Sequence, residues 1–343
     1  MGWKRSRLRK LTISLGLLAT LALALPALAS AARVLYASGH SIDASRLATF
    51  GGHTVVAPGP EGFDGCSDSE WASALARTDY DVLIVGEDAP DCSNTLSPDT
   101  LTAIRNFVNA GHAYIQTGAH GDQTGFMNAV FGFGTTETSD TENGGLTGTL
   151  LPSANGTQFA GGPTTLTDPS ETNLLSGTPG TPIYSGPEGT WVFLTKVGLG
   201  KLVYAAWDLC GDADGGCGNP PADEEDWYRV LDRAIQYATT FTVDGVTRNK
   251  KKGTATITVT LPNSGELVGS GKGVKASSAG QAVISKAVGV GTAQLVVKAK
   301  GKKRRKLNEK GKVKLNVALS YTPTGGSPQS QSLKVKLKKK HKK

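Results

Sequence analysis

This 343-residue chain is poor in the residue types that most often mark a reactive or membrane-embedded protein. It has four cysteines, five histidines and two methionines, and aromatic residues make up 6% of it. Beyond one apolar run at residues 11–25, no stretch approaches the roughly 20 apolar residues that a membrane-spanning helix needs. Residues 33–241 contain no G-x-S-x-G motif. The usual nucleophile turn of serine hydrolases is therefore excluded there.

The N-terminus has the pattern of an export signal. Lys4, Arg5, Arg7, Arg9 and Lys10 precede the apolar run, and Ala27-Leu28-Ala29 or Ala29-Ser30-Ala31 supplies small residues for cleavage. A membrane anchor is the alternative, but the run is shorter than a bilayer span. We predict a signal peptide at residues 1–31 and a secreted, extracellular or cell-wall-associated mature chain.

Charge divides the chain into two parts of opposite sign. Residues 33–241 carry 8 Lys+Arg against 26 Asp+Glu, a balance of −18, whereas residues 242–343 carry 24 against 3, a balance of +21. The net charge of +8 conceals this contrast. At roughly 100–200 residues per domain, we predict two domains at residues 32–241 and 242–337, followed by a lysine-rich tail at 338–343.

All four cysteines, Cys66, Cys92, Cys210 and Cys217, lie in the acidic part. An even number in an exported chain favours two disulfides, and four cysteines allow three pairings. We predict Cys66–Cys92 and Cys210–Cys217, because the second pair closes a short glycine-rich loop and the first ties two loops at one end of a sheet. A zinc site is the weaker alternative, since the spacings are not C-x-x-C and no histidine lies beside any of the four.

The acidic part alternates short apolar runs with helix-like segments. Residues 69–76 and 98–110 show helical spacing, the second with Ser97 as a candidate N-cap and Gly111 as its stop. The apolar runs are β-branched and unalternating, as strands buried on both faces are, and they lie at residues 34–37, 54–57, 82–85 and 113–116. This alternation predicts an α/β fold with a doubly wound, mostly parallel sheet of the flavodoxin-like kind.

The rest of the acidic part has a different character. Residues 135–190 are rich in Gly, Thr, Ser and Pro and predict short strands and loops across one edge of the sheet. Residues 190–196 and 201–207 predict a strand pair, and residues 224–241 have the spacing of an amphipathic final helix.

After residue 241 helical spacing gives way to period-two alternation. In Leu333-Lys334-Val335-Lys336-Leu337, for example, lysines alternate with apolar residues, so one face is packed and the other cationic. The expected strands lie at residues 254–261, 282–287, 293–299, 313–321 and 332–337. The pattern predicts a small all-β antiparallel sandwich. It resembles the lysine-rich immunoglobulin-like modules that end many secreted bacterial proteins.

Four stretches of the acidic part carry a further resemblance. Arg33-Val34-Leu35-Tyr36 opens the sheet, residues 79–85 form the third strand, residues 104–112 lead from a helix into a strand, and residues 200–204 lie near the end. On these stretches residues 33–241 resemble the class I glutamine amidotransferase-like fold, in the broad sense that includes ThuA-like domains. The resemblance implies an amidotransferase-like sheet and says little about activity.

An active amidotransferase of this fold would place a nucleophilic cysteine between glycines on a tight strand-to-helix turn, with a histidine and an acidic residue late in the domain. Here the turn reads Thr117-Gly118-Ala119-His120-Gly121. After His120 the next histidine is His341, inside the lysine-rich tail. The Cys-His-Glu triad is absent, which favours a protein that is not an enzyme.

Ligands of a doubly wound sheet bind beyond the carboxyl ends of its strands. The polar residues that we expect to bind a ligand in those loops are His40, Glu87, Asp88, Thr117, His120 and Asp122. A sharper hypothesis is that four residues meet over the sheet as a catalytic or metal-binding group, namely His40, Glu87, His120 and Asp208. The alternative is that the imidazoles bond to loop backbone and the carboxylates cap helices.

Residues 208–217 alternate carboxylates with glycines, as calcium loops do. Asp208, Asp212 and Asp214 are the candidate ligands for a divalent metal such as calcium, although no bidentate glutamate stands where an EF-hand requires one. A disulfide-closed acidic turn is the alternative. No other cofactor is expected.

Basic clusters at residues 249–252, 302–306 and 338–343 predict binding to a polyanion. Nucleic acid is disfavoured because this region has one aromatic residue, Tyr321, and so no platform for stacking bases. We therefore expect an anionic cell-wall polymer or lipid surface as the partner. The competing interpretation is that the lysines only solubilise the domain and protect strand edges.

Together these observations predict a secreted or envelope-associated, non-enzymatic protein. Its degenerate amidotransferase-like domain would bind a small polar ligand, a glycan or a protein, and its basic domain would attach to anionic surface polymers. The alternative is a secreted, metal-assisted hydrolase acting on carbohydrate through His40, His120 and the nearby carboxylates.

Overall fold

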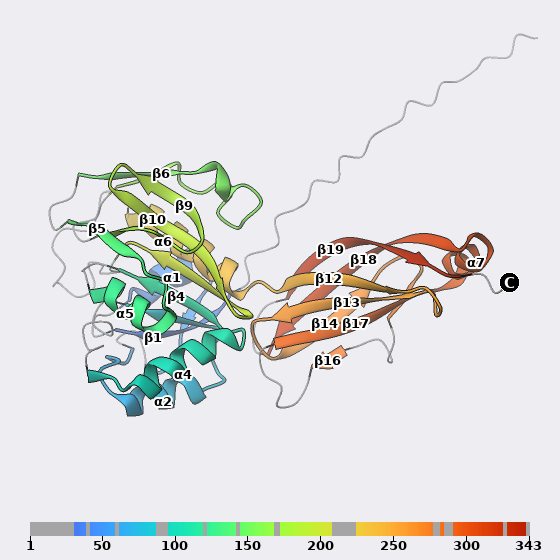
Figure 1. Cartoon of the computed structure of the whole chain (residues 1–343), viewed down its shortest axis with the longest axis horizontal. Helices are drawn as coiled ribbons and strands as arrows, with labels where there is room; N and C mark the ends of the chain where they lie inside the picture. The colour runs from blue at the N-terminus through green and yellow to red at the C-terminus, as the bar shows by residue number, and fades with distance from the viewer. Residues whose placement is uncertain are drawn as a thin grey trace, which may run out of the picture.

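The computed structural model describes residues 31–38, 42–58, 62–86, 95–118, 122–141, 145–167, 172–207, 224–276, 282–284, 291–324 and 328–340. The predicted signal peptide lies outside these ranges except for its last residue, so it stays a prediction. Within the described ranges, no helix has the length and apolar content that crossing a bilayer requires. An α/β domain and a β-rich domain lie end to end (Figure 1).

A mixed 11-stranded sheet forms the centre of the α/β domain. Its parallel part has the order β2-β1-β3-β4-β11, the flavodoxin-like order with β11 as the fifth strand. Antiparallel strands extend it as β10-β9-β6-β7, and β8 pairs with both β10 and β5. The bounds are β1 (Arg33–Ala37), β2 (Thr54–Val55), β3 (Val82–Val85), β4 (Ala113–Thr117), β5 (Thr136–Thr141), β6 (Thr147–Leu150), β7 (Thr165–Thr167), β8 (Thr172–Ser176), β9 (Thr181–Gly186), β10 (Gly189–Val197) and β11 (Gly200–Ala205).

Helices cover the parallel strands in two groups. One group pairs α1 with α6, and the other places α4 between α2 and α5. The predicted N-cap is confirmed, because the Ser97 hydroxyl accepts the backbone N–H of Thr100 at 3.3 Å. The bounds are α1 (Ala44–Gly51), α2 (Asp68–Ala76), α4 (Pro98–Asn109), α5 (Asp122–Phe131) and α6 (Glu224–Thr239), with a 3₁₀ turn, η2, at Pro152–Ala154.

The α/β fold expected from the sequence is confirmed for the parallel strands β2, β1, β3, β4 and β11. The strand pair near residue 200 is the antiparallel β10–β11 pair, with Val197 opposite Gly200. The Gly- and Thr-rich stretch supplies β5 to β9 at one edge of the sheet. Helices α1 and α5 were not predicted, because α1 is only eight residues long and the apolar residues of α5 are crowded into its second half rather than repeated at helical spacing.

The second domain consists of two four-stranded sheets that share one core. The strand orders are β12-β13-β17-β15 and β16-β14-β18-β19. Alternation along β18 buries Val313, Leu315 and Val317 and leaves the residues between them exposed. The bounds are β12 (Thr242–Asn249), β13 (Thr254–Leu261), β14 (Gly265–Ser270), β15 (Val274–Ala276), β16 (Ala282–Ile284), β17 (Gly291–Ala299), β18 (Lys312–Pro323) and β19 (Gln329–Lys338).

This domain is not all-β, which corrects the sequence prediction. A helix, α7 (Gly301–Lys310), connects β17 to β18. Its lysines, arginines and leucine are good helix formers, and Gly311 ends it in the left-handed region at φ 64°. The hydrophobic pattern could not reveal this helix, because Leu307 is its only large apolar residue and is buried against the sandwich.

The two domains meet at the edge of the sheet where the parallel strands begin. Asp81 precedes β3, pairs with Arg33 at 2.9 Å and accepts the side-chain N–H of Asn263 at 3.1 Å. Gln329 Nε2 donates to the carbonyl of Thr239 at the end of α6, at 3.2 Å. These contacts join the second domain to the amino ends of the strands, opposite the carboxyl ends where a ligand is expected.

Candidate ligand-binding edge of the parallel sheet

Four strand ends lie side by side at the candidate site. Ala37 of β1 is in register with Val85 of β3, and Thr117 of β4 with Ala205 of β11; β3 and β4 also pair. Neighbouring strands are about 4.8 Å apart, so the four chain exits span about 15 Å. The residues of the predicted catalytic group follow these ends by two or three positions and are His40, Glu87, His120 and Asp208.

The fold thus confirms that these four loops leave one edge of the sheet. Their side chains lie outside the described residues, together with those of Asp88, Asp212 and Asp214. Asp122 is the first residue of α5, and its side chain is likewise outside what the structure describes. The meeting of imidazoles and carboxylates at this edge stays a prediction.

Thr117 is the one predicted ligand residue whose side chain is described. It is fully buried, and its hydroxyl donates to the carbonyl of Val85 at 3.2 Å. The neighbouring Gln116 donates to the carbonyls of Val85 at 3.3 Å and Thr117 at 3.0 Å, and accepts from the Tyr114 hydroxyl at 2.7 Å. These bonds hold the ends of β3 and β4 together and give the site a rigid floor.

Two glycines set how the loops leave the sheet. A Cβ on Gly86 would lie 2.6 Å from the Tyr36 hydroxyl, and one on Gly118 would lie 2.4 Å from the Tyr204 hydroxyl. At both glycines the backbone therefore leaves its strand in close contact with a buried tyrosine. The Tyr204 hydroxyl in turn donates to the carbonyl of Asn173 on β8. Sequence reasoning missed these tyrosines, because they read as ordinary core residues of buried strands.

A tryptophan cluster supports the β11 side of the edge. Trp207, two residues beyond β11, packs against Trp227 at 5.7 Å and edge-on against Tyr228 at 5.1 Å between ring centroids. All three rings are buried. The Trp207 Nε1 has no hydrogen-bond partner among the described residues, and a buried unpaired donor of this kind costs about 1–3 kcal/mol.

One carboxylate near this edge caps a helix, which is the role that the alternative interpretation gives to the carboxylates of these loops. Asp43 accepts the backbone N–H groups of Ser45 at 2.8 Å and Arg46 at 3.0 Å at the start of α1. Burial acts to raise its pKa, but the hydrogen bonds from Ser45 and Arg46 outweigh burial and hold the pKa below its ordinary value. Arg46 also pairs with Glu224 at 3.0 Å, which ties α1 to the first turn of α6.

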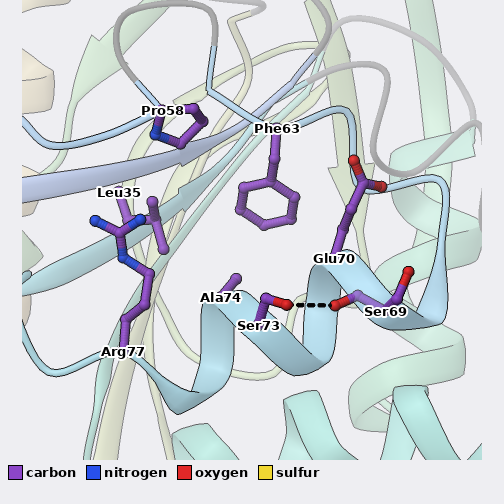
Figure 2. A pocket seen from close by; sticks show the side chains of 8 residues that line it. All are labelled: Leu35, Pro58, Phe63, Ser69, Glu70, Ser73, Ala74 and Arg77. Atoms are coloured by element: carbon purple, nitrogen blue, oxygen red, sulfur yellow. Dashed lines mark hydrogen bonds between the residues drawn. The ribbon is translucent and has the colours of Figure 1, made fainter.

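A groove of about 240 Å³ lies beside α2 (Figure 2). Leu35 and Phe63 form its apolar side, Glu70 and Ser73 project from α2 around it, and Arg77 follows the end of the helix. Its polar groups are already engaged, since Glu70 accepts from Ser67 at 2.8 Å and Arg77 pairs with Asp79 at 2.7 Å. Nothing in this lining indicates a particular ligand.

Metal and disulfide predictions fall mostly beyond the described part of the chain. Within that part, no three His, Cys, Asp or Glu side chains are grouped so as to hold a metal ion. Cys66 is disulfide-bonded. Cys92, Cys210 and Cys217 lie outside the described residues, so both predicted pairings and the calcium loop remain untested.

Comparison with known proteins gives similarity only at the level of solved structures. No family model and no curated protein sequence matches the chain. The similar structures include cytoplasmic protein STM1381 from Salmonella typhimurium LT2, with a TM-score of 0.44 and 13% identity over 60% of this chain and 99% of that one. They include a ThuA-like protein from Parabacteroides merdae, with a TM-score of 0.40 and 13% identity over 65% and 94%.

A third similar structure is alpha-L-fucosidase isoenzyme 2 from Paenibacillus thiaminolyticus. Its TM-score is 0.37 and its identity 11%, over 90% of this chain and 48% of that one. ThuA-like proteins are thus among the structures that the chain is similar to. At these scores the likeness assigns neither a family nor an activity.

Proposed function

We propose that this is a secreted, envelope-associated, non-enzymatic protein. In this proposal a degenerate amidotransferase-like domain binds a small polar ligand, a glycan or a protein at the carboxyl edge of its sheet. The second domain, an immunoglobulin-like module in our interpretation, attaches the molecule to an anionic cell-wall polymer or lipid surface. The carrying observation is that the cations gather at the end of the second domain remote from the α/β domain.

The positions of the lysines and arginines along the strands explain why they lie at that end. Of the 24 Lys and Arg in residues 242–343, none lies in residues 253–271, 287–297 or 315–333. These ranges include the junction residues Asn263, Tyr321 and Gln329. Within the described residues, the cations instead occupy the β12–β13 hairpin, the turn before β15 and β15 itself, the end of β17, α7, the start of β18 and the end of β19. Figure 1 places α7 at the far tip, and we call this end the cationic tip.

The placement of the two domains supports a division of labour. Because the junction uses the amino ends of the parallel strands, the second domain does not cover the carboxyl edge, where we propose that the ligand binds. A cationic tip at the opposite end can then bind a surface without covering that edge. Specific hydrogen bonds join the two domains at this junction.

Attachment is tested by binding of the full mature chain to purified envelope fragments across a salt series. Binding should weaken steadily as salt rises, because neutralising each anionic group releases counterions. Replacing all five cations at residues 302–306 with glutamine should reduce it, and glutamine keeps the helix propensity of α7. Binding that does not change with salt concentration would refute the attachment proposal.

Ligand binding and export have separate tests. A thermal-shift screen of glycans and polar metabolites should find compounds that stabilise the wild type but not a His40→Ala/His120→Ala variant. If every stabilising compound acts equally on both, the ligand edge is not where we propose. Export predicts that the mature N-terminus, read by N-terminal sequencing, begins near residue 30 or 32; an intact Met1 in the cell would contradict it.

A further inference from the structure

Lysines face one another across two adjacent strands of the cationic tip. Lys312 is directly opposite Lys338, and Lys314 is directly opposite Lys336, in the antiparallel β18–β19 pair. All four are exposed on the same face. Like charges directly opposite each other destabilise a sheet. Between described residues of this domain, no ion pair joins any of these lysines to a carboxylate. We call this arrangement the lysine ladder.

Protection of a sheet edge does not explain the ladder. Lysines on an edge strand prevent pairing with another chain, and β19 is an edge strand. However, β18 pairs with β14 only at residues 318–323. The part of β18 that carries Lys312 and Lys314 borders α7 on that side, where Lys303 Nζ bonds to the carbonyl of Lys314, and a helix that covers a strand edge already protects it. The Lys336 carbonyl on the outer side of β19 is already bonded to Arg248 of β12, at 2.9 Å.

Helix α7 adds cations where its own dipole disfavours them. The first turn of α7 has no acidic residue, and Lys302, Lys303 and Arg304 lie near its N-terminus. Positive side chains are favourable at a helix C-terminus and unfavourable at an N-terminus. A bound anion would relieve both this repulsion and that within the ladder.

The two features border a common groove of about 340 Å³. Lys303 and Lys306 of α7 line it, with Lys312 and Lys314 of β18 and Lys336 of β19. Buried Leu307 fixes α7 against the sandwich, and Lys303 Nζ donates to the carbonyl of Lys314 at 3.4 Å. The groove therefore lies between two packed elements, α7 and the β18–β19 pair, whose exposed lysines line it.

We propose that this groove binds a linear phosphate polymer, with successive phosphates meeting successive rungs of the ladder. The proposal rests on the envelope attachment above and names its partner. Rungs recur every two residues, about 6.6–6.8 Å along the strands, so a chain with one phosphate in each short repeat presents an anion to each. Lysine ammonium groups suit phosphate as point charges.

Other polyanions fit the described tip less well. Nucleic acid would need aromatic rings for its bases, and Tyr321, the only aromatic residue of residues 242–343, is buried. A lipid surface would favour a helix with an exposed apolar face. The leucine of α7 points into the core, and no large apolar side chain is exposed among the described residues of this domain.

The test measures binding of the full mature chain to synthetic poly(glycerol phosphate) of fixed length over a range of salt. The variant is Lys314→Gln/Lys336→Gln, and the matched control is Lys250→Gln/Lys251→Gln in the β12–β13 hairpin. At a slope of about 0.7 per contact for a flexible polyanion, losing two contacts lowers the salt slope by about 1.4 and the affinity about tenfold near 0.15 M salt. The control should lose clearly less.

A second readout separates binding from folding. Because the ladder repels itself, Lys314→Gln/Lys336→Gln should melt at the same or a higher temperature than the wild type while binding more weakly. Equal losses in the variant and the control would overturn the groove. Polyglutamate binding as tight as poly(glycerol phosphate) would overturn the phosphate assignment, and tighter binding to phosphatidylglycerol vesicles would replace the polymer with a lipid surface.

The same experiment distinguishes failure of the groove from failure of attachment. If the wild type binds envelope fragments in a salt-dependent way, but the ladder variant binds poly(glycerol phosphate) no more weakly than the control variant does, the proposed function stands and the groove is rejected. A wild type that binds neither envelope fragments nor poly(glycerol phosphate) rejects both.

Discussion

Replacing Asn263 with alanine should uncouple the two domains. Asn263 is 8% exposed, and its Nδ2 donates to the carbonyl of Asp81 at 3.2 Å and to its carboxylate at 3.1 Å. A hydrogen bond to a charged group contributes about 1.5–3 kcal/mol and one to a neutral group about 0.5–1.5 kcal/mol. Arg33 still neutralises Asp81 in the variant. We therefore expect the free energy that couples unfolding of the two domains to fall by about 2–4 kcal/mol, the sum of the two lost hydrogen bonds.

Tryptophan fluorescence isolates this effect. Trp71, Trp191, Trp207 and Trp227 lie in the α/β domain, and residues 242–343 contain no tryptophan. Asn263→Ala is in the other domain, so it shifts the tryptophan transition only through the junction. With a urea slope of about 2–3 kcal/mol per molar, the midpoint should fall by about 1 M. Asn316→Ala, at an exposed position of β18, is the control. Equal midpoints for the two variants would refute the coupling.

Three further outcomes are expected. Burial lowers the pKa of Lys201 to about 7 from 10.5, so the unfolded chain binds more protons between these values and stability should rise from pH 7 to 9. Lys201→Met should flatten this rise in the urea midpoint, although it also removes the bonds to the carbonyl of Tyr237 in α6 and to that of Thr240 just beyond it. Burial lowers the pKa of His112 to about 4 from 6.5, so stability should fall as the pH drops through this window, and His112→Phe should lessen the fall in melting temperature between pH 7 and 5. The hydrolase alternative requires turnover of a glycan or ester that His40→Ala/His120→Ala abolishes; a wild type without turnover removes that alternative.

The local patterns of the sequence were sufficient for the parallel half of the α/β domain. Strands β1, β3 and β4 are continuous apolar runs because they are buried on both faces, and Ser97 and Pro98 mark the start of α4 by chemistry that acts within one turn. The same reasoning failed for α7, since a cationic helix with one apolar residue has no periodicity to detect.

The sequence by itself determined which loops carry polar and charged groups, and that the charge changes sign near residue 241. Only the tertiary structure decided where those charges lie. Strand register brings Lys314 opposite Lys336, although 21 residues separate them, and the bonds from Asn263 to Asp81 fix which edge of the α/β sheet the second domain covers. Both depend on contacts between residues far apart in the chain, which composition and local periodicity do not encode.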